Sequence, residues 1–408
     1  MFASISSGIR QYLLITANYW AFTLTDGALR MLVVLHFHAL GYSPLDIAFL
    51  FLFYEVFGVV TNLVGGWLGA RLGLNKTMNI GLILQVGALI MLAAPAAWLT
   101  VPWVMAAQAL SGIAKDLNKM SAKSAIKLLV PEDAQGKLYQ WVALLTGSKN
   151  TLKGVGFFLG GVLLTLFGFT SSVLMMAAGL FIVWIMSILN LKESLGKTKT
   201  KPKFKDVFSK SQAVNVLSAA RLFLFAARDV WFVVAIPVFF ADTLGWDHWT
   251  VGGFMACWVI GYGVIQSLAP YVTGKRSGVL PDGRVAVFWL FPLLMIPAGM
   301  AAVLNAGMDM PFSSDWLEVC LIGGLMMFGA FFAVNSSLHS YLIVSYAKED
   351  GVSLDVGFYY MANAMGRLVG TILSGGVYQL YGLEACLWIS SLFLFLAWLI
   401  SFKLPQTT

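Results

Sequence analysis

Apolar residues recur along the whole chain in runs of about 20 residues, and short breaks rich in glycine, proline and asparagine separate them. A helix of that length crosses about 30 Å of hydrocarbon. Helices also satisfy their own backbone hydrogen bonds, which lipid cannot do for them. The pattern therefore predicts twelve membrane-spanning helices, at 11–39, 45–69, 77–97, 101–129, 138–167, 170–190, 211–240, 249–272, 285–306, 316–345, 355–381 and 384–402.

The composition agrees with a membrane protein. Of the 408 residues, 59% are apolar and 11% are charged, whereas a soluble protein carries about a quarter charged residues. The longest polar break, 192–210, holds seven lysines near the middle of the chain. We therefore expect a linker at 192–210 between one six-helix bundle at 1–191 and a second at 211–408, with no room for a separate soluble domain.

The first apolar stretch follows Arg10 and has no small-residue cleavage site, so we expect a membrane span there and not a removable signal. Cys257, Cys320 and Cys386 stand singly in apolar segments, a pattern typical of small core residues and not of a disulfide or a thiolate metal site. We expect no metal site and no cofactor.

Among the predicted loops, lysine and arginine occur only in alternate ones. Basic residues favour the cytoplasmic side of a membrane. The loops that lack them should face outward, which places both termini in the cytoplasm. These loops are 40–44, 97–101, 168–170, 241–248, 307–315 and 382–384.

Charges also occur inside the predicted spans, where each costs about 3 kcal/mol or more unless it meets water or a partner. Nine are cations and four are anions, a surplus of five positive charges that a bound polyanion would relieve. The surplus predicts a transporter of an anionic organic solute. The cations are Arg30, Lys115, Lys119, Lys123, Lys149, Lys153, Arg221, Arg228 and Arg367, and the anions are Asp26, Glu55, Asp116 and Asp229.

The fourth span repeats a lysine at every fourth residue, at Lys115, Lys119, Lys123 and Lys127. Four residues turn a helix by about 400°, so the lysines form one basic stripe. Asn118 adds hydrogen-bonding capacity beside it. The alternative for Lys123 and Lys127 is that they extend to the inner membrane interface.

Lys149 and Lys153 lie one turn apart in the fifth span, with Asn363 and Arg367 at the matching depth of the eleventh. They line a solute site or, alternatively, pair with Glu55 or Asp116. We assign solute contacts also to arginines, whose planar forks bind phosphate or carboxylate, and to a histidine in a polar stretch of the tenth span. These are Arg30, Arg221, Arg228 and His339.

The four carboxylates have two possible roles. Asp26 lies one turn before Arg30 and can pair with it, and Asp229 can hold Arg228 or Arg221 in place. If transport is coupled to protons, the same carboxylates are the candidate proton carriers. Both alternatives stay open for Asp26, Glu55, Asp116 and Asp229.

The two halves resemble weak parallel repeats. Asp26 has a counterpart in Asp229, and Gly160–Gly161 matches Gly375–Gly376. The loop 65–77 resembles the cytoplasmic signature of major facilitator permeases, with Ala70 where that family has an acidic residue. The resemblance implies an all-α membrane protein of the major facilitator superfamily fold, with 12 transmembrane helices in two six-helix bundles and the solute site near the midplane.

Longer strings resemble a particular family. LTDGALRMLVVLHFHALGYSPLD (24–46), AAQALSGIAKDLNKMSAKSAIKLLVPEDAQG (106–136) and LTGSKNTLKGVGFFLGG (145–161) are similar to the ArsJ permeases, bacterial exporters of organoarsenicals. The resemblance implies a bacterial inner-membrane exporter of 1-arseno-3-phosphoglycerate that confers arsenate resistance. It also implies a functional partner, the glyceraldehyde-3-phosphate dehydrogenase that makes this ester.

The sequence allows two alternative interpretations. An antiporter for another organophosphate or organic anion would share every physical feature above. A membrane-embedded enzyme or sensor is disfavoured, because the chain holds no HExxH, GxSxG or His/Asp cluster and no added soluble domain. We expect no nucleic-acid partner and a monomer in the bilayer.

Overall fold

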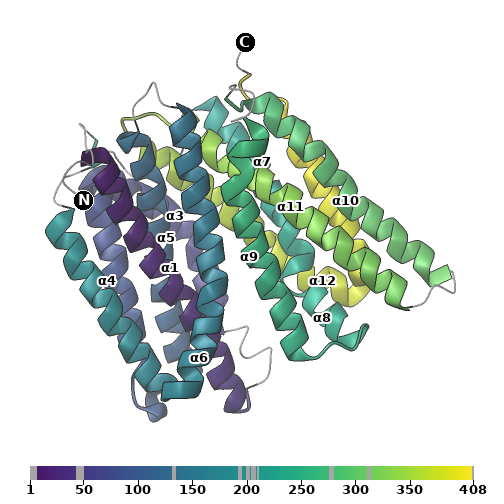
Figure 1. Cartoon of the computed structure of the whole chain (residues 1–408), viewed down its shortest axis with the longest axis horizontal. Helices are drawn as coiled ribbons and strands as arrows, with labels where there is room; N and C mark the ends of the chain where they lie inside the picture. Colours follow the sequence, from purple (N-terminus) through teal and green to yellow (C-terminus); the bar gives the residue numbers. More distant parts are fainter. Residues whose placement is uncertain are drawn as a thin grey trace. The chain divides into compact units, whose positions relative to one another are not determined.

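The computed structural model describes residues 7–42, 50–130, 135–191, 195–198, 203, 208, 211–274, 280–309 and 314–406. Within these ranges every regular element is a helix (Figure 1). The helices are α1 (Ser7–Ala39), α3 (Leu52–Leu72), α4 (Leu74–Leu92), the short 3₁₀ helix η1 (Ala96–Trp98), α5 (Val101–Leu129), α6 (Gln135–Asn190), α7 (Gln212–Phe232), α8 (Ala235–Asp242), α9 (His248–Thr273), α10 (Gly283–Asp309), α11 (Ser314–Tyr346) and α12 (Val352–Ser401).

Two of these helices are too long for one membrane crossing. α6 has 56 residues and α12 has 50, which at 1.5 Å per residue is about 75–85 Å. Gly168 in α6 and Gly382 in α12 have φ of 74° and 75°, a left-handed conformation that ends a helix and that glycine adopts freely. Each element is therefore two helices in sequence, as predicted by the breaks after 167 and 381.

The predicted all-helical fold is confirmed. The span 211–240 is made of α7 and α8, and α3 begins at Leu52, while residues 43–49 of the predicted second span lie outside the described residues. Eight elements in the described ranges are long and apolar enough to cross a membrane. α1 and α5 are not among those eight, and they carry several of the intramembrane charges.

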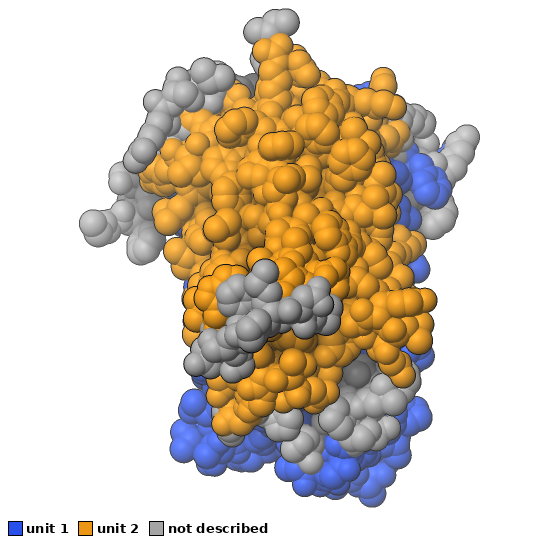
Figure 2. All heavy atoms as spheres, turned by 90° about the vertical axis from the view of Figure 1, so that its right-hand side faces the viewer, with its two compact units in different colours: residues 1–209, 344–361 blue, residues 210–343, 362–408 orange. Residues whose placement is uncertain are grey.

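The contacts divide the chain into two compact units (Figure 2). Unit 1 comprises 1–209 and 344–361, and unit 2 comprises 210–343 and 362–408. The end of α11 and the start of α12 belong to unit 1 because α12 packs on α3, where Ser353 Oγ donates to the carbonyl oxygen of Gly66 at 2.8 Å. The division at 192–210 stays a prediction.

Glycines bring α1 and α6 of unit 1 into backbone contact. A Cβ on Gly156 would lie 2.7 Å from the carbonyl oxygen of Leu24, and one on Gly160 would overlap the carbonyl oxygen of Ala28. Small residues at this spacing let membrane helices approach closely. The contact sets Asp26 of α1 against α6.

Unit 2 repeats this arrangement between α7 and α12. A Cβ on Gly366 would overlap the carbonyl oxygen of Leu222, and one on Gly370 would lie 2.7 Å from that of Ala226. Gly366 and Gly370 lie 210 residues after Gly156 and Gly160. The residues whose carbonyl groups they face, Leu222 and Ala226, lie 198 residues after Leu24 and Ala28.

This correspondence corrects the repeat alignment proposed from the sequence. It equates Arg30 with Arg228 and Lys153 with Asn363. Asp26 and Asp229 are therefore not equivalent positions. Gly375 and Gly376 are also not the counterparts of the contact glycines, because a Cβ on either would meet nothing within 4 Å.

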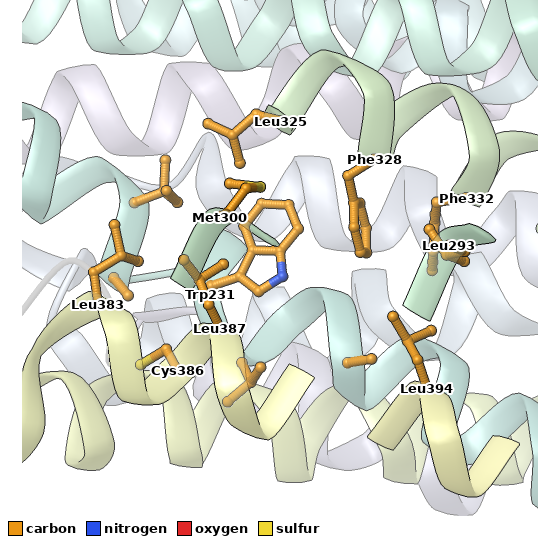
Figure 3. Close-up of a cluster of buried hydrophobic side chains, with 14 of the residues drawn as sticks. Trp231, Leu293, Met300, Leu325, Phe328, Phe332, Leu383, Cys386, Leu387 and Leu394 are labelled. Atoms are coloured by element: carbon orange, nitrogen blue, oxygen red, sulfur yellow. The ribbon is translucent and has the colours of Figure 1, made fainter. Parts of the chain in front are cut away.

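A cluster of large apolar side chains forms the core of unit 2, with Trp231 of α7 at its centre (Figure 3). The Trp231 ring packs edge-on against Phe328 of α11, with centroids 4.9 Å apart. Its indole nitrogen donates to Ser390 Oγ of α12 at 3.2 Å. These contacts fix the part of α7 that carries Arg228 and Asp229.

The linker segment 195–198 binds the turn between α3 and α4. The Thr198 N–H and hydroxyl both donate to the carbonyl oxygen of Ala70, at 2.9 and 3.1 Å, and Leu74 N–H donates to Leu195 O at 2.7 Å. Gly196 between them has φ of 71° and packs on Leu74. Ala70 stands at the position where the loop signature has an acidic residue. The backbone hydrogen bonds between 195–198 and the α3–α4 turn therefore form a latch at the place where the signature has a charged side chain.

Replacing Gly196 by Ala is expected to weaken this latch and destabilise the protein by about 1–2 kcal/mol, because a side chain disfavours the left-handed conformation. The added Cβ would also lie 2.7 Å from Leu74. Thermal unfolding of the purified protein in detergent measures the effect. Gly179→Ala is the control, since its Cβ would meet nothing within 4 Å. An unchanged unfolding temperature in Gly196→Ala would contradict the latch.

Candidate solute-binding site

The lysine stripe of α5 lies in the interior of unit 1. Lys115 Nζ is 3.8 Å from the centre of the Tyr54 ring. Lys119 Nζ is 2.6 Å from Asp116 Oδ1 and 4.7 Å from the centre of the Tyr360 ring. The stripe is held by one carboxylate and by aromatic faces.

Lys123, the next lysine along the stripe, is only 3% exposed. Its Nζ donates to Thr146 Oγ1 at 2.9 Å and lies 4.9 Å from the centre of the Tyr360 ring. Lys127 is directed elsewhere and donates to the carbonyl oxygen of Ser345 at 3.2 Å. The burial of Lys123 argues against the alternative that this side chain extends to the membrane interface.

A second cluster in unit 1 joins α1, α3 and α6 around Asp26. Tyr54 OH donates to Asp26 Oδ1 at 2.7 Å, and Lys153 Nζ lies 4.0 Å from Asp26 Oδ2. Arg30 pairs with Glu55 at 3.5 Å. Lys153 therefore pairs with Asp26, whereas the alternative drawn from the sequence was a pair with Glu55 or Asp116.

The Arg30 guanidinium also lies over two aromatic rings. Its Cζ is 5.0 Å from the Phe51 centroid and 4.8 Å from the Tyr54 centroid. A cation over the face of an aromatic ring gains about 0.5–2 kcal/mol. The Tyr54 ring is thus in contact with both Arg30 and Lys115.

Unit 2 holds its cations around Asp229, which is 0% exposed. Asp229 Oδ1 accepts from Arg228 Nε and Nη2 at 2.6 and 2.5 Å, and Asp229 Oδ2 accepts from Arg367 Nε at 3.2 Å. The sequence analysis predicted that Asp229 can pair with Arg228. The contact between Asp229 and Arg367 was not predicted, because Arg367 lies on α12, 138 residues from Asp229 in the chain.

Arg221 lies at a separate position in unit 2 and is 3% exposed. Its Nε donates to Asn363 Oδ1 at 2.9 Å, and its Nη1 donates to the carbonyl oxygen of Ser336 at 3.2 Å. The guanidinium also lies 4.0 Å from the centre of the Phe225 ring. These three contacts of Arg221 are with neutral groups.

His339 belongs to a buried polar band on α11. Its side chain is 0% exposed, and neither ring nitrogen has a hydrogen-bond partner among the described residues. Ser336 of the same band accepts from Gln266 Nε2 at 3.0 Å. A buried polar group without a partner costs about 1–3 kcal/mol. His339 therefore offers hydrogen bonds that the described protein atoms leave unused.

Asn118 is likewise buried at 0% exposure in α5. Its Nδ2 donates to the carbonyl oxygen of Ala114 at 2.9 Å, whereas its Oδ1 has no partner within the described ranges. Lys149 is half-buried and lies one turn before Lys153 in α6. Both residues remain candidates for solute contacts.

All four intramembrane carboxylates are paired with cations, and together they take up Arg30, Lys119, Lys153, Arg228 and Arg367. The contacts described above for Lys115, Lys123 and Arg221 are with aromatic faces and neutral oxygens. Aromatic contacts offset part of the cost of burying a cation without removing its charge. By count, the nine intramembrane cations outnumber the four carboxylates by five.

Sequence reasoning missed several neutral residues of these clusters. Tyr54, Tyr360 and Phe225 provide the aromatic faces, and Thr146 accepts from Lys123. Aromatic residues are common throughout this chain, with 30 Phe, 13 Tyr and 14 Trp. Their contacts with cations depend on helix packing, and no local spacing marks them.

The long apolar helices and the charges within them are typical of a polytopic membrane protein. Residues 12–310 match the family model of the Major Facilitator Superfamily. The chain belongs to this superfamily and is a secondary transporter of small solutes. A search of curated proteins finds no matching relative.

Solved structures share the fold over nearly the whole chain. The human organic anion transporter MFSD10 (TETRAN) is 14% identical, with a TM-score of 0.75, and the match covers 97% of this chain and 100% of that one. A bacterial homologue of the iron transporter ferroportin is 13% identical, with a TM-score of 0.73 and coverage of 96% and 98%. The E. coli fucose:proton symporter FucP is 13% identical, with a TM-score of 0.72 and coverage of 98% and 100%.

Proposed function

We propose that this transporter moves a polyanionic phosphate ester. The observation that carries the proposal is the excess of intramembrane cations, nine against four carboxylates, together with Lys115, whose ammonium group lies over the Tyr54 ring. A neutral solute would leave this positive surplus uncompensated. An anion would add charge-assisted hydrogen bonds, which are roughly twice as strong as neutral ones.

Each unit has its own basic groups. Unit 1 contributes the ammonium groups of its lysines, which bind phosphate as point charges, and the guanidinium of Arg30, while the cations of unit 2 are guanidinium groups, which bind phosphate bidentately. His339 adds two unused ring nitrogens in unit 2.

The resemblance to the ArsJ permeases supports a specific cargo, 1-arseno-3-phosphoglycerate, which would be exported and so confer arsenate resistance. This ester carries a phosphate at one end and an arsenate at the other. Pentavalent arsenic needs no thiolate ligands, and the cysteines Cys257, Cys320 and Cys386 are free thiols. The same proposal places the chain in a bacterial inner membrane with both termini in the cytoplasm. Its metabolic partner would be a glyceraldehyde-3-phosphate dehydrogenase.

The second candidate is an antiporter for another organophosphate or organic anion. The same surplus of positive charge favours it, and one structural neighbour is named an organic anion transporter. Only the sequence segments that resemble the ArsJ permeases favour the first candidate over the second.

Expression of the permease and the dehydrogenase, separately and together, in arsenate-sensitive cells tests the cargo. We expect resistance only with both proteins. Uptake of radiolabelled 3-phosphoglycerate into inside-out vesicles tests the wider anion class. No resistance with measurable uptake would favour the second candidate, and no uptake of any anion together with no resistance would contradict both.

Neutralising a site cation should lower this transport at least tenfold while expression stays near normal, because each substitution removes a charge that the anion meets. The variants are Lys119→Gln, Lys149→Gln, Arg228→Gln and Arg367→Gln. Lys403→Gln is the matched control, since Lys403 is exposed after the end of α12. Transport that survives three of the four substitutions would refute the site.

A further inference from the structure

An apolar groove runs between α10 and α11 of unit 2. Its volume is about 730 Å³, and its lining comes from 291–304 on α10 and from 317–331 on α11. The described lining consists of apolar side chains, glycines, a proline and the Cys320 thiol, and none of these residues carries a charge. The groove therefore differs in chemistry from the candidate solute site and offers an anion no partner.

The groove follows the long direction of both helices. On α10 the lining residues come as adjacent pairs that repeat every four residues, which keeps them on one face of the helix. At 1.5 Å per residue this stripe is about 20 Å long, and the hydrocarbon of one leaflet is about 15 Å thick. The groove therefore spans about one leaflet in the direction of its acyl chains. In the predicted orientation, with 307–315 outside, this is the outer leaflet.

The groove has a rigid floor and a flexible rim. Met300 and Leu321 form the floor, and both are buried members of the core cluster around Trp231 (Figure 3). Met295 and Met327 form part of the rim and are more than half exposed. Methionine is flexible and adapts to irregular apolar partners. A molecule in the groove would pack on the core of unit 2 and be held at its sides by these side chains.

Two exposed glycines keep the groove open. A Cβ on Gly299 or on Gly323 would meet nothing within 4 Å. By contrast, α6 carries large apolar side chains at its surface, such as Val162 and Ile182, which are more than half exposed. The glycines therefore leave a hollow in which a neighbouring molecule can make contacts on several sides.

The lining excludes water as the occupant. A buried water needs about two to four polar partners, and the described lining residues provide no polar side chain beyond one thiol. An empty hollow would forfeit the dispersion contacts of its walls. The groove therefore favours a hydrocarbon occupant.

A lipid chain fits the groove better than a helix of a second copy. A Cβ on Gly324 of α11 would lie 2.6 Å from Met300 Cγ, so α10 and α11 approach closely beneath the groove. Closely packed helices have axes about 8–10 Å apart, and the gap between them is narrower than a third helix, about 10–12 Å across. At about 30 Å³ per methylene, close to the share of a water molecule in the liquid, a chain of about 16–18 carbons needs roughly 500 Å³ and fits within the groove.

We propose that the α10–α11 groove retains one acyl chain of a membrane phospholipid, which completes the apolar packing of unit 2. The headgroup and the second chain stay in the bilayer. This inference goes beyond the proposed function and does not rest on it, because it involves no anionic solute.

Photochemical labelling of the full-length protein tests the proposal. The protein is reconstituted in vesicles of phosphatidylethanolamine and phosphatidylglycerol with a trace of phosphatidylcholine that carries a diazirine on one acyl chain. Peptide mass spectrometry after irradiation locates the cross-links. We expect them to be about tenfold denser on 291–304 and 317–331 than on the lipid-facing surface of α6, as a retained chain requires.

Gly299→Leu and Gly323→Leu fill the groove and should each lower this labelling about tenfold. Leucine favours a helix more than glycine does, so both variants should fold. Gly376→Leu is the matched control, because Gly376 is an exposed glycine of α12 outside the groove whose Cβ would also meet nothing within 4 Å. Its labelling should equal that of the wild type.

Thermal unfolding of delipidated protein in detergent gives a second, independent measurement. A ligand that binds the folded state raises its unfolding temperature by mass action. Added phosphatidylcholine should therefore stabilise the wild type and Gly376→Leu, and it should stabilise Gly323→Leu much less, because leucine already occupies the hollow.

Three results would overturn the inference. Cross-links spread evenly over α6 and α10 would indicate ordinary contact with the bilayer. Labelling of the groove that persists in both filled variants would show that the hollow does not hold the chain. A dimer cross-linked through Cys320, with the groove unlabelled by lipid, would assign the groove to a second copy. Absence of anion transport would refute the proposed function and leave the lipid result unchanged.

Discussion

Asp229→Asn is expected to abolish transport and to destabilise the protein by about 3–5 kcal/mol, the usual cost of breaking a buried ion pair from one side. Asp229 is fully buried and compensates Arg228 and Arg367 together. Asparagine has nearly the same shape but carries no charge. Two guanidinium groups would then repel each other in the interior of unit 2.

Thermal unfolding with and without anion measures this effect. An anion that binds the folded state stabilises it by mass action, so a polyanion such as 3-phosphoglycerate should restore part of the lost unfolding temperature. Glu384→Gln is the control for loss of one carboxylate, since Glu384 lies in α12 of unit 2 and contacts Asn305 and Trp388. The double variant Asp229→Asn/Arg367→Gln should recover stability without transport, because it removes one cation along with the anion. Wild-type stability in Asp229→Asn would contradict the pairing.

Gly366→Val should disrupt unit 2, with a loss of about 3 kcal/mol, near the upper end for overpacking a close contact. A Cβ at Gly366 would overlap the carbonyl oxygen of Leu222, which belongs to helix backbone and cannot move aside alone. α12 would have to separate from α7. Arg367, the next residue, would then leave Asp229, and transport should fail.

Gly375→Val in the same helix is the matched control, because its Cβ would meet nothing within 4 Å. Unfolding temperature and vesicle uptake should both be near wild type there. Gly156→Val in unit 1 should reproduce the defect, since Gly156 packs on Leu24 as Gly366 packs on Leu222. A mild phenotype in both glycine variants would contradict the backbone contact and the repeat correspondence drawn from it.

Much of the fold could be predicted from local pattern. The breaks at Gly168 and Gly382 divide elements of 56 and 50 residues, and the apolar runs place those breaks to within a few residues. The prediction works because lipid imposes a length on every crossing and forces the backbone into helices.

The partners of the charged residues could not be predicted in the same way. Asp26 meets Tyr54 from 28 residues away, and Asp229 meets Arg367 from 138 residues away. The repeat alignment drawn from residue identity also failed, because it matched Asp26 with Asp229. The equivalent positions of the two units are identified by the backbone carbonyl group that each contact glycine faces. Any residue type has such a carbonyl group, so residue identity does not reveal these positions.

The amino-acid sequence by itself determined that this protein spans a membrane as an all-helical transporter and that its spans carry more cations than anions. Both properties follow from composition and one-dimensional spacing. Only the tertiary structure decided which carboxylate pairs with which cation and which aromatic rings the cations contact. Those pairings depend on how closely two helices approach, and glycine contacts between distant segments set that approach.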